Sequence, residues 1–565
     1  MYGPVSDVIP SSPVFEMYPI GFVYLSQYLT RYDYTVRIIN LAAKMLGNRK
    51  YDPEKEISKL RTPVAFGIDL HWLPHVQGSL EIAAIVKKHH PNTPIIFGGL
   101  SATYFHKELI KYPQVDFIIR GDSTEEPMLK LIRTLKSRSV SFEEIPNLVY
   151  RENQSVRENP MNNIVSELDG IDYEHIIESV IAHRDLSGYI PFEGWERYPI
   201  TMVLTCRGCS YNCKTCGGSS KFYSDYCNRK ELAVRKPELV AQDIKLISRY
   251  LKGPVFIVGD IQQPSEDYAD SLLSVLKSLG IDNHVVLEFF DMPSGKLLEK
   301  IADCIPRFNI QISPESHDEE IRKLFGRPYS NQQMEEAIDR ALKLGCQKFD
   351  LFFMTGLPKQ TVKSILDTVQ YCDYLLERFG KSKKVFPFIA PLAPFLDPGS
   401  EVFENPEKFG YRLLCHTLEE HRLAMLEPSW KYMLSYETRW MSREDIVYGS
   451  YDAALELNRI KYKHGLLTYE KFKKADGRIQ QAVRVMREID EIVENETNEI
   501  RERKLADLKK KMDRLRDSTI CDKSQLEWPT RFFKMDMPAW SLRIPLLHFI
   551  RPGLVKRFFR VCNRA

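Results

Sequence analysis

The sequence predicts an α/β protein built from two successive α/β units and a helical C-terminal region. Three observations lead to this prediction. Short apolar, β-branched segments alternate with stretches of helical periodicity over residues 1–394, as in parallel strands joined by helices. Beyond residue 394 the pattern changes to long charged stretches with helical spacing. At 565 residues the chain is also too long for one ordinary core, so two or three domains are expected.

Residues 1–135 have the pattern of a doubly wound α/β layer. Apolar residues at helical spacing predict helices at Gly21–Leu29 and Gly78–His89. The strand that normally opens such a layer is missing, so we expect a trimmed start or an alternative start codon. The segments expected as buried parallel strands are Tyr34–Leu41, Val64–Asp69, Pro94–Phe97 and Val115–Arg120.

A second α/β unit is predicted for residues 201–394, after a connecting region over residues 136–200 that contains a hairpin at Asn147–Arg157. Six strands that alternate with helices indicate a partial (β/α)6 barrel of the TIM type, whose chemistry gathers at the C-terminal ends of the strands. The expected strands are Thr201–Leu204, Val255–Val258, Val285–Phe290, Phe308–Ile312, Lys348–Phe353 and Lys384–Ile389.

Residues 395–565 are expected to be mainly helical. Lys471–Asp517 mixes charges of both signs with Leu and Ile, which predicts one or two long exposed helices. Trp540–Ala565 is basic and apolar and contains no acidic residue. This tail could lie on an anionic membrane surface, but a packed terminal segment with solvated arginines is the favoured interpretation.

The composition is that of an ordinary globular protein. A net charge of +3 over 79 basic and 76 acidic residues gives no general reason to expect nucleic acid or a membrane as a partner. The sequence contains no apolar run of about 18 residues, and its start lacks the pattern of a signal peptide. We therefore expect a cytoplasmic protein.

The cysteines are concentrated in one place. None of the eleven precedes Cys206, and four lie between Cys206 and Cys216. A disulfide framework would be spread over a small secreted domain, so this concentration indicates a metal or cluster in a reducing compartment.

Cys209, Cys213 and Cys216 have the spacing C-x3-C-x2-C within TCRGCSYNCKTCGG, directly after the first barrel strand. Three thiolates on one loop can each hold one iron of a 4Fe-4S cluster and leave the fourth iron open to the amino and carboxylate groups of S-adenosylmethionine (SAM). The alternative is a four-cysteine zinc site that includes Cys206. It is less favoured because the eleven residues from Cys206 to Cys216 leave no room for a zinc-ribbon hairpin.

This segment, RGCSYNCKTC, resembles the RGCPYNCSFC motif of radical SAM enzymes that carry an N-terminal cobalamin-binding domain. Ser210 replaces the usual proline, and Thr215 replaces an aromatic residue that normally packs near the adenine. The resemblance covers about residues 15–395. It implies that Cys209, Cys213 and Cys216 ligate the cluster.

The resemblance also implies SAM-binding residues at later strand ends. Gly259 and Asp260 follow the second barrel strand, where the family often has a turn for the amino group of SAM. Ser313 and Glu315 match a segment that reaches the ribose or carboxylate, and Gly356 begins a Gly-Leu-Pro turn below the adenine. Each of these features alone is ordinary turn chemistry, and their order behind the cysteine loop is what makes them persuasive.

The N-terminal unit resembles the flavodoxin-like cobalamin-binding domain of the same enzymes. The matching stretches are FEMYPIG, IFGGLSAT and IRGDSTE, at residues 15–21, 96–103 and 119–125. The alternative is a relic domain that binds no ligand. His71 is not predicted as a cobalt ligand, because Pro74 replaces the glycine of the D-x-H-x-x-G signature. The implied cobalamin contacts are Gly98, Gly99, Ser101, Thr103, Gly121 and Glu125.

Together these features imply a cobalamin-dependent radical SAM enzyme of the class B methyltransferase type, which methylates an unactivated carbon of a small-molecule substrate. Such an enzyme also needs an electron donor, such as flavodoxin or ferredoxin. One alternative is a non-methylating radical cyclase or rearrangement enzyme. Another, from a different class, is a non-catalytic metal-binding scaffold that uses the charged C-terminal helices as a partner surface.

Overall fold

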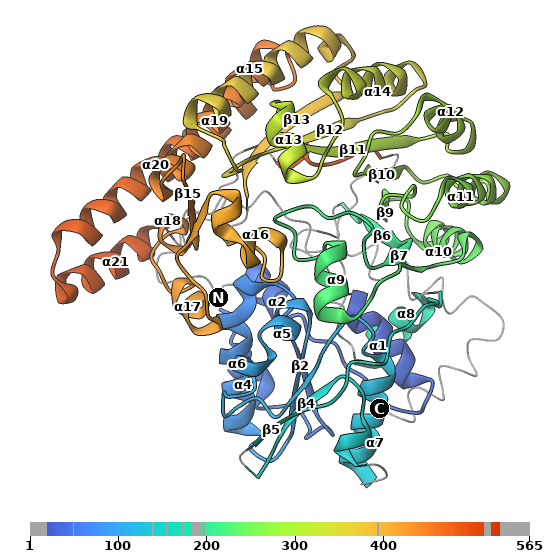
Figure 1. The fold of residues 1–565 in the computed structure, drawn as a ribbon, viewed down its shortest axis with the longest axis vertical. Coiled ribbons are helices and arrows are strands. Elements are labelled where there is room, and N and C mark those ends of the chain that lie inside the picture. The colour runs from blue at the N-terminus through green and yellow to red at the C-terminus, as the bar shows by residue number, and fades with distance from the viewer. Residues whose placement is uncertain are drawn as a thin grey trace.

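The computed structural model has an N-terminal α/β unit, a second α/β unit and a C-terminal helical region (Figure 1). The structure describes residues 20–512 with short gaps, together with residues 521 and 523–530. The gaps are at residues 49, 138–140, 154, 171–172, 184, 186–194, 196–197 and 393–394. The basic tail Trp540–Ala565 and most of the motif at residues 15–21 lie outside the described residues.

The N-terminal unit contains a five-stranded sheet with the order β1-β2-β3-β4-β5. Three parallel strands are present where the sequence predicts them, and the predicted hairpin adds two antiparallel strands to the edge of this sheet. The predicted helices are also present, as α1 (Ile20–Thr30) and α4 (Val76–His89). The strands are β1 (Phe66–Asp69), β2 (Ile95–Gly98), β3 (Phe117–Ile119), β4 (Leu148–Glu152) and β5 (Ser155–Glu158).

The prediction of a strand at Tyr34–Leu41 is wrong. Residues 34–40 belong to no helix or strand, and α2 (Leu41–Gly47) begins where that strand was expected to end. Ile38 packs against Val23 and Tyr24 of α1. An apolar, β-branched segment becomes a strand only when another strand pairs with its backbone, and no described strand does so here.

The second unit is a six-stranded, fully parallel sheet with the order β13-β12-β11-β10-β9-β6. All six barrel strands are therefore confirmed. The edge strands β6 and β13 do not pair with each other, so the barrel is partial. The strands are β6 (Thr201–Leu204), β9 (Val255–Val258), β10 (Val285–Phe289), β11 (Phe308–Glu315), β12 (Phe349–Thr355) and β13 (Val385–Pro391).

The barrel helices begin and end where the sequence supplies capping residues. Ser265 caps α11 (Glu266–Leu279) by accepting a hydrogen bond from a backbone N–H of its first turn. Ser330 and Gln333 form a capping box at the start of α14 (Asn331–Lys343). Such caps satisfy N–H groups that the helix itself leaves unpaired. The other helices of this unit are α10 (Pro237–Tyr250), α12 (Gly295–Cys304), α13 (Glu319–Phe325) and α15 (Val362–Phe379).

The two faces of the barrel strands differ in exposure. On β12, Leu351 and Phe353 pack in the main hydrophobic core and are fully buried, whereas Phe352 and Met354 point to the other face and are partly accessible. Since side chains alternate along a strand, this second face is the interior of the barrel. The C-terminal segment enters the barrel on the N-terminal side of Phe352. There the indole N–H of Trp528 donates to Asp350 Oδ2 at 2.7 Å.

The C-terminal region closes one side of the barrel. Helix α19 (Arg443–Lys463) packs on α15 and on the edge strand β13. Helices α20 (Tyr469–Asn495) and α21 (Asn498–Met512) then project to one side of the molecule (Figure 1). They confirm the long helices expected in Lys471–Asp517, as far as residue 512. Two short antiparallel strands, β14 (Tyr411–Leu413) and β15 (Tyr436–Thr438), precede them.

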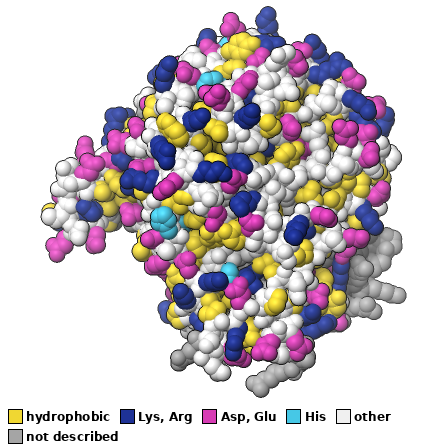
Figure 2. Space-filling model, in the orientation of Figure 1, with side chains coloured by type: hydrophobic (Ala, Val, Ile, Leu, Met, Phe, Trp, Pro, Cys, Tyr) yellow, Lys and Arg dark blue, Asp and Glu magenta, His cyan; other side chains and the backbone are white. Residues whose placement is uncertain are grey.

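The surface is mixed in charge. On the face shown in Figure 2, Lys and Arg side chains alternate with Asp and Glu, and neither sign forms a continuous patch. This agrees with the near balance of 79 basic and 76 acidic residues. Among the described helices, none combines the length and the hydropathy needed to cross a membrane.

Candidate functional site

The three cysteines lie on one loop at the C-terminal edge of the barrel sheet. This loop leaves β6 through the short strand β7 (Cys206–Arg207) and ends at α9 (Ser220–Cys227). The thiols of Cys209 and Cys213 both contribute to the raised pKa of Cys216, so the three groups lie within electrostatic reach of one another. Burial is the largest cause of this shift, and it also raises the pKa of Cys209 to about 11.

The residues of this loop fit an iron–sulfur cluster. Across the described residues, no three Cys, His, Asp or Glu side chains converge as the ligands of a single metal ion would. Cluster ligation does not require such convergence, because each thiolate binds a different iron. Cys206 is buried on β7, where its thiol accepts from Thr205 Oγ1 at 3.8 Å. It also lies within electrostatic reach of Cys209.

The loop is held in place by the end of α13 and the residue that follows it. The backbone N–H of Lys214 donates to the carbonyl of Phe325 at 2.9 Å, and Cys213 packs with Phe325 and Leu357. Gly326 has φ +111°, and a Cβ atom there would approach the carbonyl oxygen of Asn212 to 3.2 Å. A glycine is needed at this position because the two backbones approach closely.

Glu315 and Arg327 form a buried pair next to the cysteines. Glu315 Oε1 lies 3.7 Å from Arg327 Nε, and Oε2 of Glu315 has no hydrogen-bond partner in the described structure. Burial raises the pKa of Glu315 to about 7, against the opposing effect of Arg327. For Arg327, burial favours a lower pKa, but the neighbouring Cys213 and Glu315 raise it overall. A free carboxylate oxygen and a guanidinium thus flank the cysteine loop.

The backbone of Glu315 is strained. Its φ is +66°, which is uncommon for a residue with a side chain. Such conformations cost about 1–3 kcal/mol each and cluster at functional sites. Strand pairing between β11 and β12 is irregular at this point, between Ile312 and Glu315. The irregularity lies where the sequence places the fourth-strand segment expected to contact SAM.

The second barrel strand ends at Gly259 and Asp260. Gly259 has φ +89°, and a Cβ atom there would lie 2.9 Å from Thr205 Oγ1. Asp260 is fully buried and accepts backbone N–H groups from Gln262 and Phe290, both at 2.9 Å. Its carboxylate therefore joins the ends of β9 and β10, and a role of Asp260 toward SAM stays a prediction.

Gly356 follows β12 in a crowded turn. It has φ +93°, and a Cβ atom there would lie 2.8 Å from the hydroxyl of Tyr436. The hydroxyl of Tyr411 donates to the carbonyl of Gly356 at 2.8 Å. Both tyrosines belong to the antiparallel strand pair β14–β15, so the C-terminal region shapes this turn. Ser313, the other predicted SAM contact, lies on the barrel interior and is partly accessible.

Two acidic residues at this site were not predicted from the sequence. Glu288 of β10 accepts from Gln311 Nε2 at 3.1 Å across the barrel interior, and burial raises its pKa. Asp397, beyond β13, accepts the backbone N–H of Gly217 at 2.8 Å beside Cys216. Strand alternation could have placed Glu288 on the inner face. No sequence signal pairs Asp397 with a loop 180 residues earlier.

The predicted cobalamin contacts lie at the C-terminal edge of the first sheet. Gly99 and Gly121 both have positive φ, +114° and +83°. A Cβ atom on Gly99 would approach the backbone of Leu70 and His71 to 2.6 Å. Gly98 precedes this turn and has ordinary room, since its nearest neighbour would be 3.8 Å away. The edge is therefore built of closely packed backbone.

The hydroxyls of Ser101 and Thr103 are used within the protein. Ser101 Oγ donates to the carbonyl of His71 at 3.0 Å, and Thr103 Oγ1 donates to that of Gly99 at 2.8 Å. Thr103 also accepts the N–H of Gly121 at 2.9 Å. In this arrangement the two side chains brace the turns at the sheet edge, and their contact with cobalamin stays a prediction.

A solvent-accessible aromatic surface accompanies these turns. His71 and Trp72 come shortly after β1, and Trp72 is 45% exposed. The pKa of His71 is lowered by the surrounding protein, although the residue is exposed. Glycine turns next to exposed rings fit a large flat ligand that backbone and ring faces can approach closely.

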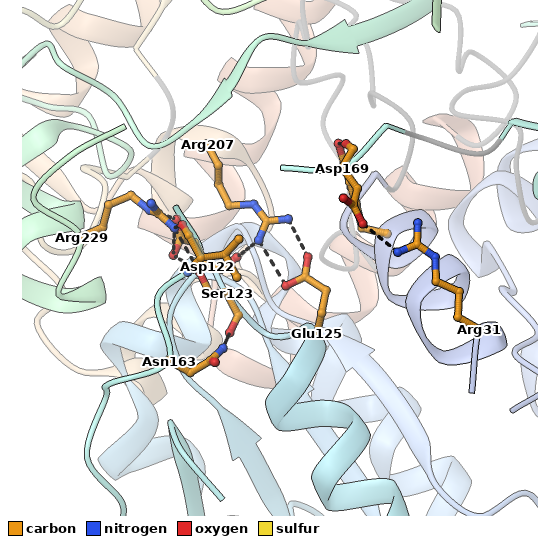
Figure 3. Close-up of polar contacts among 10 residues, drawn as sticks. Arg31, Asp122, Ser123, Glu125, Asn163, Asp169, Arg207 and Arg229 are labelled. Carbon is orange, nitrogen blue, oxygen red and sulfur yellow. Dashed lines mark hydrogen bonds and ion pairs between the residues drawn. The ribbon is translucent and has the colours of Figure 1, made fainter. Parts of the chain in front are cut away.

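Two arginines join the loop after β3 to its surroundings (Figure 3): Arg207 joins it to the cysteine loop, and Arg229 joins it to the segment after α9. Arg207 donates to both carboxylate oxygens of Glu125 and to the carbonyl of Asp122. Arg229 pairs with the carboxylate of Asp122 and donates to Ser123 Oγ at 3.0 Å. Glu125, predicted as a cobalamin contact, is thus engaged in this junction. The junction fixes the predicted cobalamin edge against the segment that leads into Cys209.

Two family models match the chain. The model described as the radical SAM superfamily matches residues 203–372, and the model described as the B12 binding domain matches residues 7–128. Similar curated proteins include an uncharacterized methyltransferase of Pyrococcus horikoshii, 23% identical over 63% of this chain and 73% of that protein. Another is cytidylyl-2-hydroxyethylphosphonate methyltransferase of Streptomyces wedmorensis, 22% identical over 70% of this chain and 80% of that protein.

Solved structures share the fold. The radical SAM methyltransferase TsrM of Kitasatospora setae, solved with cobalamin and a [4Fe-4S] cluster, has a TM-score of 0.57 at 13% identity, covering 81% of this chain and 90% of that one. The cobalamin-dependent SAM radical enzyme OxsB, solved with aqua-cobalamin and SAM, has a TM-score of 0.54 at 13% identity, covering 97% of this chain and 76% of that one. At these identities the likeness concerns the fold.

Proposed function

We propose that this chain, which carries a radical SAM domain and an N-terminal B12-binding domain, is a cobalamin-dependent enzyme that methylates an unactivated carbon of a small molecule. The proposal depends chiefly on the junction of Arg207 with Glu125 and Asp122, which holds the predicted cobalamin edge against the cysteine loop. Two cofactors that act on one substrate have to be held close together.

We propose that Cys209, Cys213 and Cys216 hold a 4Fe-4S cluster. When bound, the cluster supplies the electron that cleaves SAM to methionine and a 5'-deoxyadenosyl radical, and cobalamin supplies the methyl group. The chain's part is to bind and orient the cofactors and to exclude water from them. The Cys213 side chain is buried with Phe325 and Leu357, which keeps solvent from this side of the loop.

The SAM site of this proposal lies between the cysteine loop and the strand ends of the barrel. Arg327 offers a guanidinium to the SAM carboxylate, and Glu315 offers its unpaired Oε2 to an amino or hydroxyl group. Gly259 and Gly356 let the ligand approach the backbone, since both have positive φ. Ser313 faces the interior from the same edge, and Asp260 supports it by joining β9 to β10.

Cobalamin would lie against the C-terminal edge of the first sheet. Gly98, Gly99 and Gly121 supply backbone turns, which Ser101 and Thr103 brace from behind. His71 and Trp72 supply ring surfaces. In domain terms, the proposal assigns cobalamin binding to residues 1–135 and SAM chemistry to residues 201–394. A flavodoxin or ferredoxin would supply the electron.

The test begins with anaerobic purification and reconstitution with iron and sulfide. We expect the wild-type chain to bind about four irons, as a single cubane requires, and to release 5'-deoxyadenosine from SAM when a reductant is present. Cys213→Ala should lose both. Cys227→Ala is the matched control, because Cys227 is also buried but lies at the end of α9, outside the loop. A wild-type protein that gains no cluster would rule the proposal out.

Cobalamin binding is tested separately, through the corrinoid spectrum that remains with the protein after gel filtration. Wild-type protein is expected to retain cobalamin with or without the cluster. Retention of the cluster without any cobalamin binding would leave SAM cleavage in place and remove the methyl-transfer half of the proposal.

A further inference from the structure

Both carboxylate oxygens of Asp260 are already engaged within the protein. Oδ1 accepts the backbone N–H of Gln262 and Oδ2 accepts that of Phe290, each at 2.9 Å. The hydroxyl of Tyr211 also lies 3.4 Å from Oδ2, and the Asp260 side chain is fully buried. The carboxylate that the sequence predicts for the amino group of SAM therefore serves to hold the ends of β9 and β10 together.

A second carboxylate lies beside the same turn. On β10, Leu287 is paired in register with Ile257 of β9, so the next residue, Glu288, is level with the residue that precedes Gly259. Leu287 and Phe289 are buried in the main hydrophobic core. Because side chains alternate along a strand, Glu288 points into the barrel, where it is partly accessible.

The surroundings of Glu288 place its carboxylate among the predicted SAM residues. Its Oε1 accepts from Gln311 Nε2 at 3.1 Å, which fixes one side of the group. Burial raises the pKa of Glu288 and the Asp260 carboxylate adds to this rise, whereas Gln311, the Arg327 guanidinium and the Gly259 backbone oppose it. Glu288 is therefore in contact with the Gly259 turn and within electrostatic reach of Arg327.

The amino group of SAM needs a hydrogen-bond acceptor at this turn. An amine that binds a metal through its nitrogen lone pair keeps two N–H donors, and leaving them unpaired where water is excluded is costly. A carboxylate makes the stronger, charge-assisted kind of hydrogen bond with such a donor. Glu288 has this chemistry, and it is partly accessible from the barrel interior, whereas Asp260 is fully buried.

We propose that Glu288 binds the amino group of SAM, in place of Asp260. Its carboxylate accepts an N–H of the amino group at the Gly259 turn, and Gln311 holds the carboxylate in position. The inference deepens the proposed function and rests on it, because it assumes that SAM lies at these strand ends. Oε2 of Glu315, which is suited to either an amino or a hydroxyl group, is then left for a hydroxyl.

The test compares two ligands that differ in their amino acid portion. S-adenosylhomocysteine (SAH) has the adenosine and the amino acid portion of SAM but no sulfonium to cleave, and 5'-methylthioadenosine (MTA) lacks the amino acid portion. Calorimetry under anaerobic conditions measures the binding of both to the reconstituted full-length protein. We expect Glu288→Gln to weaken SAH binding about tenfold, since one charge-assisted hydrogen bond becomes a neutral one, and to leave MTA binding unchanged.

The variant Glu288→Gln keeps an oxygen that can accept from Gln311, and unchanged MTA binding would show that the site has folded. Glu299→Gln is the matched control, because Glu299 lies on α12 with its side chain 53% exposed, and it should bind both ligands as the wild type does. Equal weakening of SAH and MTA in Glu288→Gln, or wild-type binding of SAH, would overturn the inference.

The two competing carboxylates give a second test, which does not depend on the folding of Glu288→Gln. Asp260→Asn and Glu315→Gln should each keep the wild-type ratio of SAH to MTA affinity, because neither side chain binds the amino group. Loss of this ratio in either variant would overturn the inference.

Failure of the proposed function gives a different result. A wild-type protein that forms no cluster, or that binds neither ligand, would remove the SAM site and the role of Glu288 with it. A wild-type protein that forms the cluster and prefers SAH to MTA, with the same preference in Glu288→Gln, would keep the SAM site and overturn only the role of Glu288.

Discussion

The guanidinium of Arg207 donates to both carboxylate oxygens of Glu125, with N···O distances of 2.6 and 3.2 Å. Arg207 lies two residues before Cys209, and Glu125 is the first residue of α7 (Glu125–Ser137) in the N-terminal unit. Their side chains are 15% and 13% exposed. One bidentate contact thus links the two α/β units beside the first cysteine of the loop.

Breaking this contact should destabilise the protein. Arg207→Gln leaves Glu125 partly buried and unpaired, for which a loss of about 3 kcal/mol is expected. Arg31→Gln is the control, because the Arg31–Asp169 pair is 49% and 70% exposed and should contribute less than about 1 kcal/mol. The denaturant midpoints of the two variants measure both losses of stability. In the double variant Arg207→Gln, Glu125→Gln the two losses should be less than additive, and strict additivity would show that the contact contributes nothing.

The barrel could be predicted from the sequence because each of its strands is a short apolar segment between helices and pairs with its neighbours. Tyr34–Leu41 has the same local character but finds no partner strand, so local pattern alone was misleading there. The hairpin β4–β5 was predicted, but its addition to the first sheet depends on pairing between Ile118 and Val149, which local sequence does not show.

Replacing Cys206 distinguishes the two interpretations of the cysteine segment. Cys206→Ala should leave the iron content and the release of 5'-deoxyadenosine close to wild type, because three thiolates suffice for the cluster. A four-cysteine zinc site would lose its metal in this variant. Metal analysis of Cys206→Ala beside Cys213→Ala decides the matter, and equal loss in both would contradict a three-cysteine site.

Gly98 and Gly99 should respond very differently to alanine. At Gly99 a Cβ atom would lie 2.6 Å from the backbone of Leu70 and His71, and φ is +114°. Gly99→Ala is therefore expected to lower the free energy of unfolding by roughly several kcal/mol and to abolish cobalamin binding. At Gly98 the nearest atom would be 3.8 Å away, so Gly98→Ala should fold normally.

Gly98→Ala then becomes the useful probe of cobalamin binding. If the predicted contact at Gly98 exists, the added methyl group should weaken cobalamin binding in a protein whose thermal unfolding is unchanged. Unaltered binding would remove Gly98 from the set of contacts. A Gly99→Ala protein as stable as the wild type would show that this sheet edge is less tightly packed than the structure indicates.

The candidate site could be predicted only in part, for a physical reason. Cys209, Cys213 and Cys216 are close in sequence, so their spacing alone indicates a shared ligand. Asp397 reaches Gly217 only through the packing of the segment beyond β13 on the cysteine loop, and nothing near Asp397 in the sequence indicates this contact. Likewise, Ser101 and Thr103 have the expected location, but which carbonyls take their hydroxyl protons depends on the fold.

The buried Lys461 should make stability depend on pH in a recognisable way. Burial lowers its pKa from 10.5 to about 8. Below about pH 8 the amine is charged in both states, and its burial penalty is fully present. Between about pH 8 and 10.5 the folded protein has released this proton while the unfolded chain still holds it, so this residue makes the folded state more stable as pH rises.

The variant Lys461→Met removes this contribution. We expect it to be more stable than wild type near neutral pH, and the advantage to shrink as pH rises from about 7.5 to about 10. The groups that face Lys461 are Lys348, Asp350, Cys372 and Cys521, and all are present in both proteins. Denaturant midpoints at the two pH values give the difference. An advantage that stays constant with pH would show that Lys461 keeps an ordinary pKa, and Lys463→Met provides the exposed-lysine control.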